Sequence, residues 1–232
     1  MQTIFKRYEF KYLINDRQKE KIISDMNKYM QPDKYDRATI RNIYFDTDNF
    51  LLIRRSIDKP VYKEKLRIRC YGKTDADSDV FVELKKKYKS VVYKRRVTLP
   101  EREAMNWVCN RVCNKNTQIS SEIDYFLYFY KNLRPSVFLS YEREAYAARD
   151  GSDFRVTFDK NILCRQNDLS LCSDAYGTPI LSDDMSIMEI KCSGGIPLWM
   201  TEILSREHIY KTSFSKYGTA YKNLIFNKTE EH

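Results

Sequence analysis

The stretch that decides the fold is Lys63-Glu64-Lys65-Leu66-Arg67-Ile68-Arg69-Cys70, where charged and apolar residues alternate at the period of a β-strand. One face carries the cations Lys63, Lys65, Arg67 and Arg69, and the other carries Leu66, Ile68 and Cys70. The pattern predicts a strand that buries one face and presents positive charge on the other.

Two strands predicted directly after it, at residues 80–85 and 91–98, carry charge in the same way. Glu83 and Lys85 alternate with apolar residues in the first, and Lys94 and Arg96 share a face of the second. Antiparallel pairing would place these cations side by side, and like charges directly opposite one another destabilise a sheet. Either a bound polyanion neutralises this face, or the face is simply solvated, as one side of an antiparallel sheet often is.

The sequence pattern in the rest of the chain predicts more strands that alternate charged and apolar residues, with helices between them. Strands are expected at residues 5–13, 39–47, 137–146, 154–158 and 187–192, and helices at 15–30, 100–112, 123–133 and 197–209. If the helices cover the apolar faces, the charged faces look inward and the sheet closes into a barrel wide enough for a ligand. The alternative is an open sheet with helices on one side.

Composition narrows the function classes. The chain has 232 residues, 42% of them hydrophobic, and a net charge of +9, which favours an anionic partner. We expect one domain over residues 1–232, with no membrane span because the sequence has no apolar run of about 18 residues. The charged start and the scattered cysteines predict a cytoplasmic protein, and with only 2 His a zinc site is not expected.

Several short segments, taken together and in order, resemble the VTC domain, the polyphosphate polymerase branch of the triphosphate tunnel metalloenzymes. They are residues 7–12 (RYEFKY), 43–47 (IYFDT), 66–72 (LRIRCYG), 82–85 (VELK), 141–143 (YER), 154–159 (FRVTFD), 188–191 (MEIK) and 214–217 (FSKY). The resemblance covers nearly the whole chain. It implies an α+β fold in which an eight-stranded antiparallel β-barrel forms a tunnel with helices packed on the outside.

The resemblance also implies the site. The catalytic, phosphate-binding lining would consist of Lys11, Arg67, Arg69, Lys85, Lys94, Arg143 and Arg155. Substrate contacts would come from Lys191, Ser215 and Lys216, and Glu189, helped by Glu9, would hold Mn²⁺ or Mg²⁺. Glu83 is either a second metal ligand or the partner of a neighbouring lysine, and the second interpretation is favoured.

The implied function is an ATP-dependent polyphosphate polymerase, which transfers the γ-phosphate of ATP to a growing polyphosphate chain. Hydrolytic relatives typically begin with Glu-x-Glu-x-Lys, whereas here Arg7 replaces the first glutamate, and Lys191 stands where a second glutamate would follow Glu189. Fewer carboxylates give less help in activating water, which favours transfer over hydrolysis.

Two alternative functions remain, a metal-dependent triphosphatase and a non-catalytic polyphosphate-binding module. Nucleic-acid binding is disfavoured because the aromatic residues lie on faces opposite the cations.

Overall fold

The computed structural model describes residues 8–89, 91–113 and 115–226. It divides the chain into two compact units. The first unit contains the described residues up to Thr39 together with Tyr141–Ile162 and Leu181–Ser215, and the second contains the remainder. Each unit has its own hydrophobic core.

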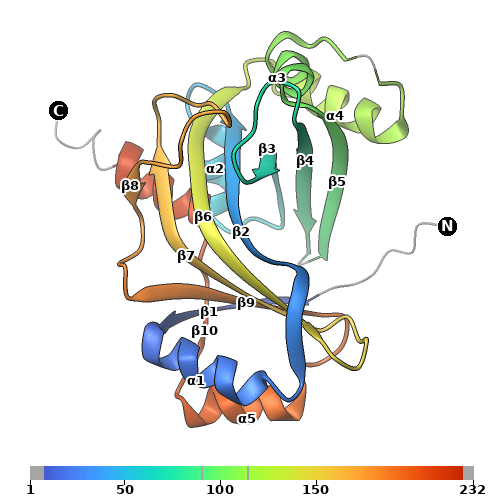
Figure 1. Ribbon diagram of the computed structural model, residues 1–232. Helices are drawn as coiled ribbons and strands as arrows, with labels where there is room; N and C mark the ends of the chain where they lie inside the picture. The colour runs from blue at the N-terminus through green and yellow to red at the C-terminus, as the bar shows by residue number, and fades with distance from the viewer. Residues whose placement is uncertain (1–7, 90, 114, 227–232) are drawn as a thin grey trace. The chain divides into compact units, whose positions relative to one another are not determined.

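In the first unit, a small antiparallel sheet is covered on one face by two helices. Strand β1 (Tyr8–Asn15) pairs with β9 (Met185–Cys192) and with the short β10 (Lys211–Thr212), and β9 pairs with β7 (Arg155–Arg165). Helices α1 (Asp16–Met26) and α5 (Leu198–Arg206) lie together on one side of these strands (Figure 1). The core that they share includes Ile22 and Met26 of α1, packed with Met200 and Ile203 of α5.

Helix α1 begins where the sequence predicted. The side chain of Asn15 accepts a hydrogen bond from the backbone N–H of Gln18, and the Gln18 side chain in turn accepts one from the N–H of Asn15. This capping box satisfies two backbone donors at the start of the helix. The helix ends at Met26, earlier than expected, and strand β2 (Met30–Asp46) already begins at Met30.

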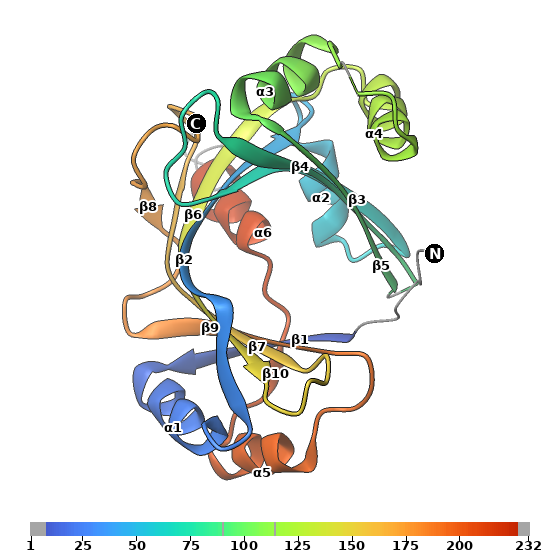
Figure 2. The ribbon, with the colours of Figure 1, turned by 45° about the vertical axis from the view of Figure 1, so that its right-hand side comes forward.

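The second unit contains the strands predicted from the opening stretch: β3 (Tyr62–Tyr71), β4 (Asp79–Tyr88) and β5 (Val91–Pro100). The apolar side chains of β3 and β4 face a core that also takes Trp107 of α3 (Glu101–Asn110) and Phe126 of α4 (Gln118–Phe129). Both helices lie beside these strands in the two views (Figures 1 and 2). The predicted alternation of a buried face and a cationic face is therefore confirmed.

Four short elements were not predicted. Helix α2 (Leu51–Ile57) and helix α6 (Lys216–Tyr221), which continues as one π-helical turn at Lys222–Phe226, pack together in the second unit through the rings of Phe50 and Tyr221. The others are β10 and a second two-residue strand, β8 (Thr178–Pro179), which pairs with β7. Elements this short carry too few residues to show a period in the sequence.

The strand order is β10-β1-β9-β7-β6-β2-β3-β4-β5, with β8 attached to β7 and β6 spanning Arg134–Ala148. The antiparallel α+β class is confirmed, but the expectation of eight strands closed into a barrel is wrong. The described residues form ten strands, and among them the two end strands, β10 and β5, do not pair with each other. Alternation determines which face of a strand is buried, whereas closure depends on strand tilt and stagger, which alternation does not encode.

No helix among the described residues combines the length and apolar character needed to cross a bilayer.

Candidate functional site

The predicted site residues fall into two sets, one in each unit. The set in the second unit lies on the face of β3, β4 and β5 opposite the hydrophobic core. There Lys65, Lys85 and Lys94 stand directly opposite one another, so that one row across three strands consists of lysines. Such a row repels itself, because like charges opposed across a sheet are destabilising.

The neighbouring row is organised by Glu83, whose side chain is 1% exposed. Its Oε2 accepts hydrogen bonds from Nε (2.9 Å) and Nη2 (2.7 Å) of Arg67, and its Oε1 accepts from Nε of Arg96 (2.8 Å) and forms an ion pair with Nζ of Lys94 (2.6 Å). Both carboxylate oxygens are thus engaged by cations. The favoured interpretation, that Glu83 is a charge partner and not a metal ligand, fits this geometry.

The pKa shifts of Glu83 and Lys94 indicate that positive charge predominates on this face. Burial alone would raise the pKa of Glu83, but the cations, above all Arg67 and Arg69, hold the pKa well below its usual range. Burial together with the neighbouring cations lowers the pKa of Lys94 to about 8, although Glu83 opposes the shift. Both shifts reflect the positively charged surroundings of this buried carboxylate.

The second set lies on one face of the sheet in the first unit. Strand register places Lys11 of β1, Glu189 of β9 and Thr157 of β7 in one row, and Glu9, Lys191 and Arg155 in the next. Within this set, Nζ of Lys191 lies 2.9 Å from Glu189 and Nζ of Lys11 lies 3.5 Å from Glu9. The opposite face of the same strands packs against α1 and α5.

Arg143 of β6 joins this set through a buried aspartate. Its Nε and Nη2 donate to the two oxygens of Asp159 at 2.6 and 2.7 Å, and Nη2 lies 4.0 Å from Glu189. Burial would lower the pKa of Arg143, but Tyr141 and Asp159 raise it well above its usual value. The guanidinium is therefore a permanent, fixed charge beside Glu189.

The residues of the first unit fit a divalent metal ion that is completed by its substrate. Glu9 and Glu189 lie on the same face, diagonally across β1 and β9. The Oγ1 of Thr157, directly opposite Glu189, is buried and has no hydrogen-bond partner among the described residues. These residues contain no group of three or more His, Cys, Asp or Glu side chains that could hold a metal alone. Mg²⁺ and similar ions are commonly held by one or two carboxylates plus substrate phosphates.

The remaining predicted residues are less tightly grouped. Arg155 donates a hydrogen bond to Asp33 at 2.6 Å, and its side chain is 45% exposed.

The C-terminal contacts are divided between the two units. Nζ of Lys11 donates a hydrogen bond to the carbonyl of Phe214, next to Ser215, at 3.1 Å. Lys216 is the first residue of α6 in the second unit. Nε of Arg69 donates to Oδ1 of Asn42. Arg7 lies outside the described residues.

Sequence reasoning missed several participants. Lys65 and Arg96 were placed on cationic faces by the strand period, but the lining implied by the family resemblance did not include them. Tyr44 and Asp159 could not be identified in this way, because their roles depend on partners from other strands, Arg67 and Arg143 respectively.

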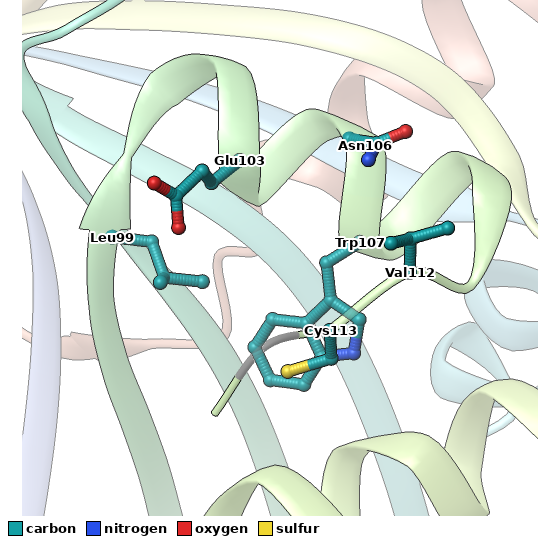
Figure 3. Close-up of a pocket in the computed structure, with 6 residues that line it drawn as sticks. All are labelled: Leu99, Glu103, Asn106, Trp107, Val112 and Cys113. Carbon is teal, nitrogen blue, oxygen red and sulfur yellow. The ribbon is translucent and has the colours of Figure 1, made fainter. Parts of the chain in front are cut away.

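A separate pocket near α3 has a different character (Figure 3). It is lined by Leu99, Glu103, Asn106, Trp107, Val112 and Cys113. The lining is partly apolar and has no cation, so it does not suit a phosphate.

The comparisons agree with the likeness seen in the sequence. A family model for the VTC domain matches residues 6–225. The fold is similar to that of a candidate adenylate cyclase from Bacillus halodurans, with a TM-score of 0.54 and 17% identity over 90% of this chain and 95% of that one. It is equally similar to a candidate adenylyl cyclase from Hippeastrum with a dominant triphosphatase activity, at a TM-score of 0.54 and 13% identity over 92% and 94% of the two chains. Identities this low show likeness of fold alone.

No sequence match was found among curated proteins. The match to the family model, by contrast, extends over nearly all of the described residues. This chain therefore belongs to the VTC domain family.

Proposed function

We propose that the chain is an ATP-dependent polyphosphate polymerase that transfers the γ-phosphate of ATP to the end of a polyphosphate chain. The observation that carries this proposal is the row of Lys65, Lys85 and Lys94 beside the Arg67–Glu83–Arg96 row. A self-repelling cationic face is relieved by a ligand that carries several negative charges close together, as a phosphate chain does. The proposal also rests on membership of the VTC domain family.

Phosphoryl transfer requires positioning and charge neutralisation more than covalent chemistry from the protein. Arg67 and Arg96 would bind phosphate oxygens through their planar forks, while Lys65 and Lys85 act as movable point charges. In the first unit, Arg143, Lys11 and Lys191 would neutralise further phosphate charge. Mn²⁺ or Mg²⁺, held by Glu189 and Glu9, would supply Lewis-acid stabilisation of charge on the phosphate oxygens when bound.

A metal-dependent triphosphatase is the second candidate. It is favoured by the triphosphatase activity of the similar Hippeastrum protein. The two reactions differ in acceptor, since hydrolysis needs an activated water and transfer needs a phosphate terminus. A polyphosphate-binding module without catalysis is the third.

Incubation of the purified protein with ATP and Mn²⁺, with the products resolved on a gel stained for polyphosphate, tests the proposal. We expect a ladder of polymer that disappears in Glu189→Gln and persists in Glu202→Gln, a matched change at an exposed position of α5 in the same unit. Release of orthophosphate without polymer would instead establish the triphosphatase. Binding of polyphosphate with intact ATP would leave only a binding module.

A further inference from the structure

Two stacked tyrosines connect α6 to the cationic face of the second unit. Tyr44 of β2 and Tyr217 of α6 are 8% and 2% exposed, and their ring centroids lie 4.6 Å apart with 17° between the planes. Nζ of Lys65 lies 5.9 Å from the centroid of the Tyr217 ring. The pair therefore adjoins the lysine row, although neither tyrosine carries a phosphate-binding charge.

Tyr217 is held at its hydroxyl by buried polar groups. The hydroxyl donates to Oδ2 of Asp46 at 2.9 Å and lies 3.0 Å from Oγ of Ser136. A phenol has one proton, so if that proton goes to Asp46, Ser136 is the donor in the second bond. Asp46 also accepts the backbone N–H groups of Leu52 and Ile53 in the first turn of α2. One aspartate thus fixes both α2 and α6, two helices that lie side by side in Figure 2.

Tyr44 extends this arrangement to an arginine. Its hydroxyl accepts a hydrogen bond from Nη1 of Arg67 at 3.0 Å, while Nε and Nη2 of the same arginine bind Glu83. The guanidinium is therefore fixed from two directions, by Glu83 and by Tyr44. Burial would raise the pKa of Tyr44, but Arg67 and Arg69 outweigh it and lower the pKa to about 8, as expected for an oxygen that faces a cluster of cations.

We infer that Tyr44 and Tyr217 are positioning residues for phosphate binding: Tyr44 orients the Arg67 guanidinium, and Tyr217 holds both the ring of Tyr44 and the start of α6, where Lys216 lies. The inference rests on the proposed function, because it requires that Arg67 binds phosphate. An arginine that is already oriented loses less conformational freedom when the ligand binds. The cost of losing that orientation should therefore appear in ligand affinity and turnover.

A double-mutant cycle tests the inference. The variants are Tyr44→Phe, which removes only the hydroxyl and keeps the stacking ring, Arg67→Lys, which keeps the charge and loses the planar fork, and the combination of both. Each is measured for turnover of ATP and for the dissociation constant of tripolyphosphate by calorimetry, with thermal unfolding as the check on folding. Tyr128→Phe, at a position of α4 that is 75% exposed, is the control for loss of a tyrosine hydroxyl.

We expect Tyr44→Phe to weaken tripolyphosphate binding about tenfold, the range for losing a hydrogen bond to a charged group. In the Arg67→Lys background the same change should have almost no effect, because Tyr44 acts through Arg67. Tyr217→Phe should weaken binding by a smaller factor. In the Tyr44→Phe background the part of that factor that acts through Arg67 should disappear, which leaves only the part that acts through Lys216. A purely structural tyrosine would lower the unfolding temperature without this coupling.

Additive effects of Tyr44→Phe and Arg67→Lys on binding, or an unchanged dissociation constant in Tyr44→Phe, would overturn the inference. If Arg67→Lys does not fold, the ¹⁵Nε–H resonance of Arg67 in wild type and in Tyr44→Phe replaces the cycle. We expect it to show a fixed side chain in the first and a mobile one in the second, and the same order in both would count against the inference. Wild-type protein that fails to bind tripolyphosphate contradicts the proposed function itself.

Discussion

At the scale of single residues, a buried carboxylate stabilises the cationic face of the second unit. Glu83 is the buried carboxylate among Arg67, Arg96 and Lys94. Removing one member of a buried ion cluster leaves the other charges uncompensated, which typically costs about 3–5 kcal/mol. Because Arg96 and Lys94 are one-third or more exposed, solvent will reduce that cost here.

Glu83→Gln should therefore lower the free energy of unfolding of the ligand-free protein, measured by urea denaturation. Tripolyphosphate should restore more stability to this variant than to wild type, because the ligand then supplies the missing negative charge. Glu202→Gln is the control and should leave both values unchanged. Equal stabilisation of Glu83→Gln and wild type by tripolyphosphate would show that the ligand does not reach this face.

The same residue predicts a pH dependence. The pKa of Glu83 is lower in the folded protein than in the unfolded chain, so the unfolded state binds more protons as the pH falls. The stability that Glu83 contributes is fully present above the unfolded pKa of about 4.3 and is lost as the pH falls toward the folded value. Wild type should thus lose more stability than Glu83→Gln between pH 5 and pH 3. Parallel stability curves for the two proteins would contradict this.

At the scale of elements, the helices of the second unit are held to the strands by large apolar side chains. Trp107 of α3 is fully buried, and its Nε1 donates to Oδ1 of Asp124 on α4 at 2.6 Å. One side chain thus fills the core beneath α3 and fixes the neighbouring helix. Its loss would leave a cavity that the surrounding residues fill only in part.

Trp107→Ala should reduce the free energy of unfolding by about 3–5 kcal/mol, measured by chemical denaturation. Tyr128→Ala on α4, where the side chain is exposed, should change it by no more than about 0.5 kcal/mol. A loss below about 1 kcal/mol in Trp107→Ala would indicate that α3 is not held by this contact.

The elements that the sequence predicted well are those with a sustained period. The cationic and apolar faces of β3, β4 and β5 follow directly from alternation, and the start of α1 agrees with the helix expected from residue 15. Helix α2 was missed because its start is satisfied from outside the helix: Asp46, at the end of β2, accepts the N–H groups of Leu52 and Ile53. A cap that lies five residues before the helix gives no local signal of the usual spacing.

At the scale of the whole molecule, the candidate site could be predicted only in part. Charge alternation identified most of the cations, and the family resemblance identified Glu189 as the metal ligand, which stays a prediction. The partners that orient these residues were not predictable, because Asp159 reaches Arg143 and Tyr44 reaches Arg67 from other strands. The closure of the sheet into a barrel was also predicted wrongly. Closure depends on how strands that are distant in sequence pair, tilt and stagger, and the alternation of residues within one strand does not encode this.

The net charge of +9 predicts how an anionic ligand arrives. Long-range attraction accelerates association and is screened beyond about 8 Å at physiological salt, whereas dissociation depends on the close contacts made by side chains such as Arg67. Raising the salt concentration from 50 to 300 mM should therefore slow association of tripolyphosphate several-fold and change dissociation much less, measured by stopped-flow. Lys131→Glu, an exposed change remote in sequence from the proposed lining, should likewise lower the association rate modestly and leave the dissociation rate unchanged. If salt acted mainly on dissociation, the affinity would come from exposed, easily screened pairs, and the oriented guanidinium of Arg67 would have no special part in binding.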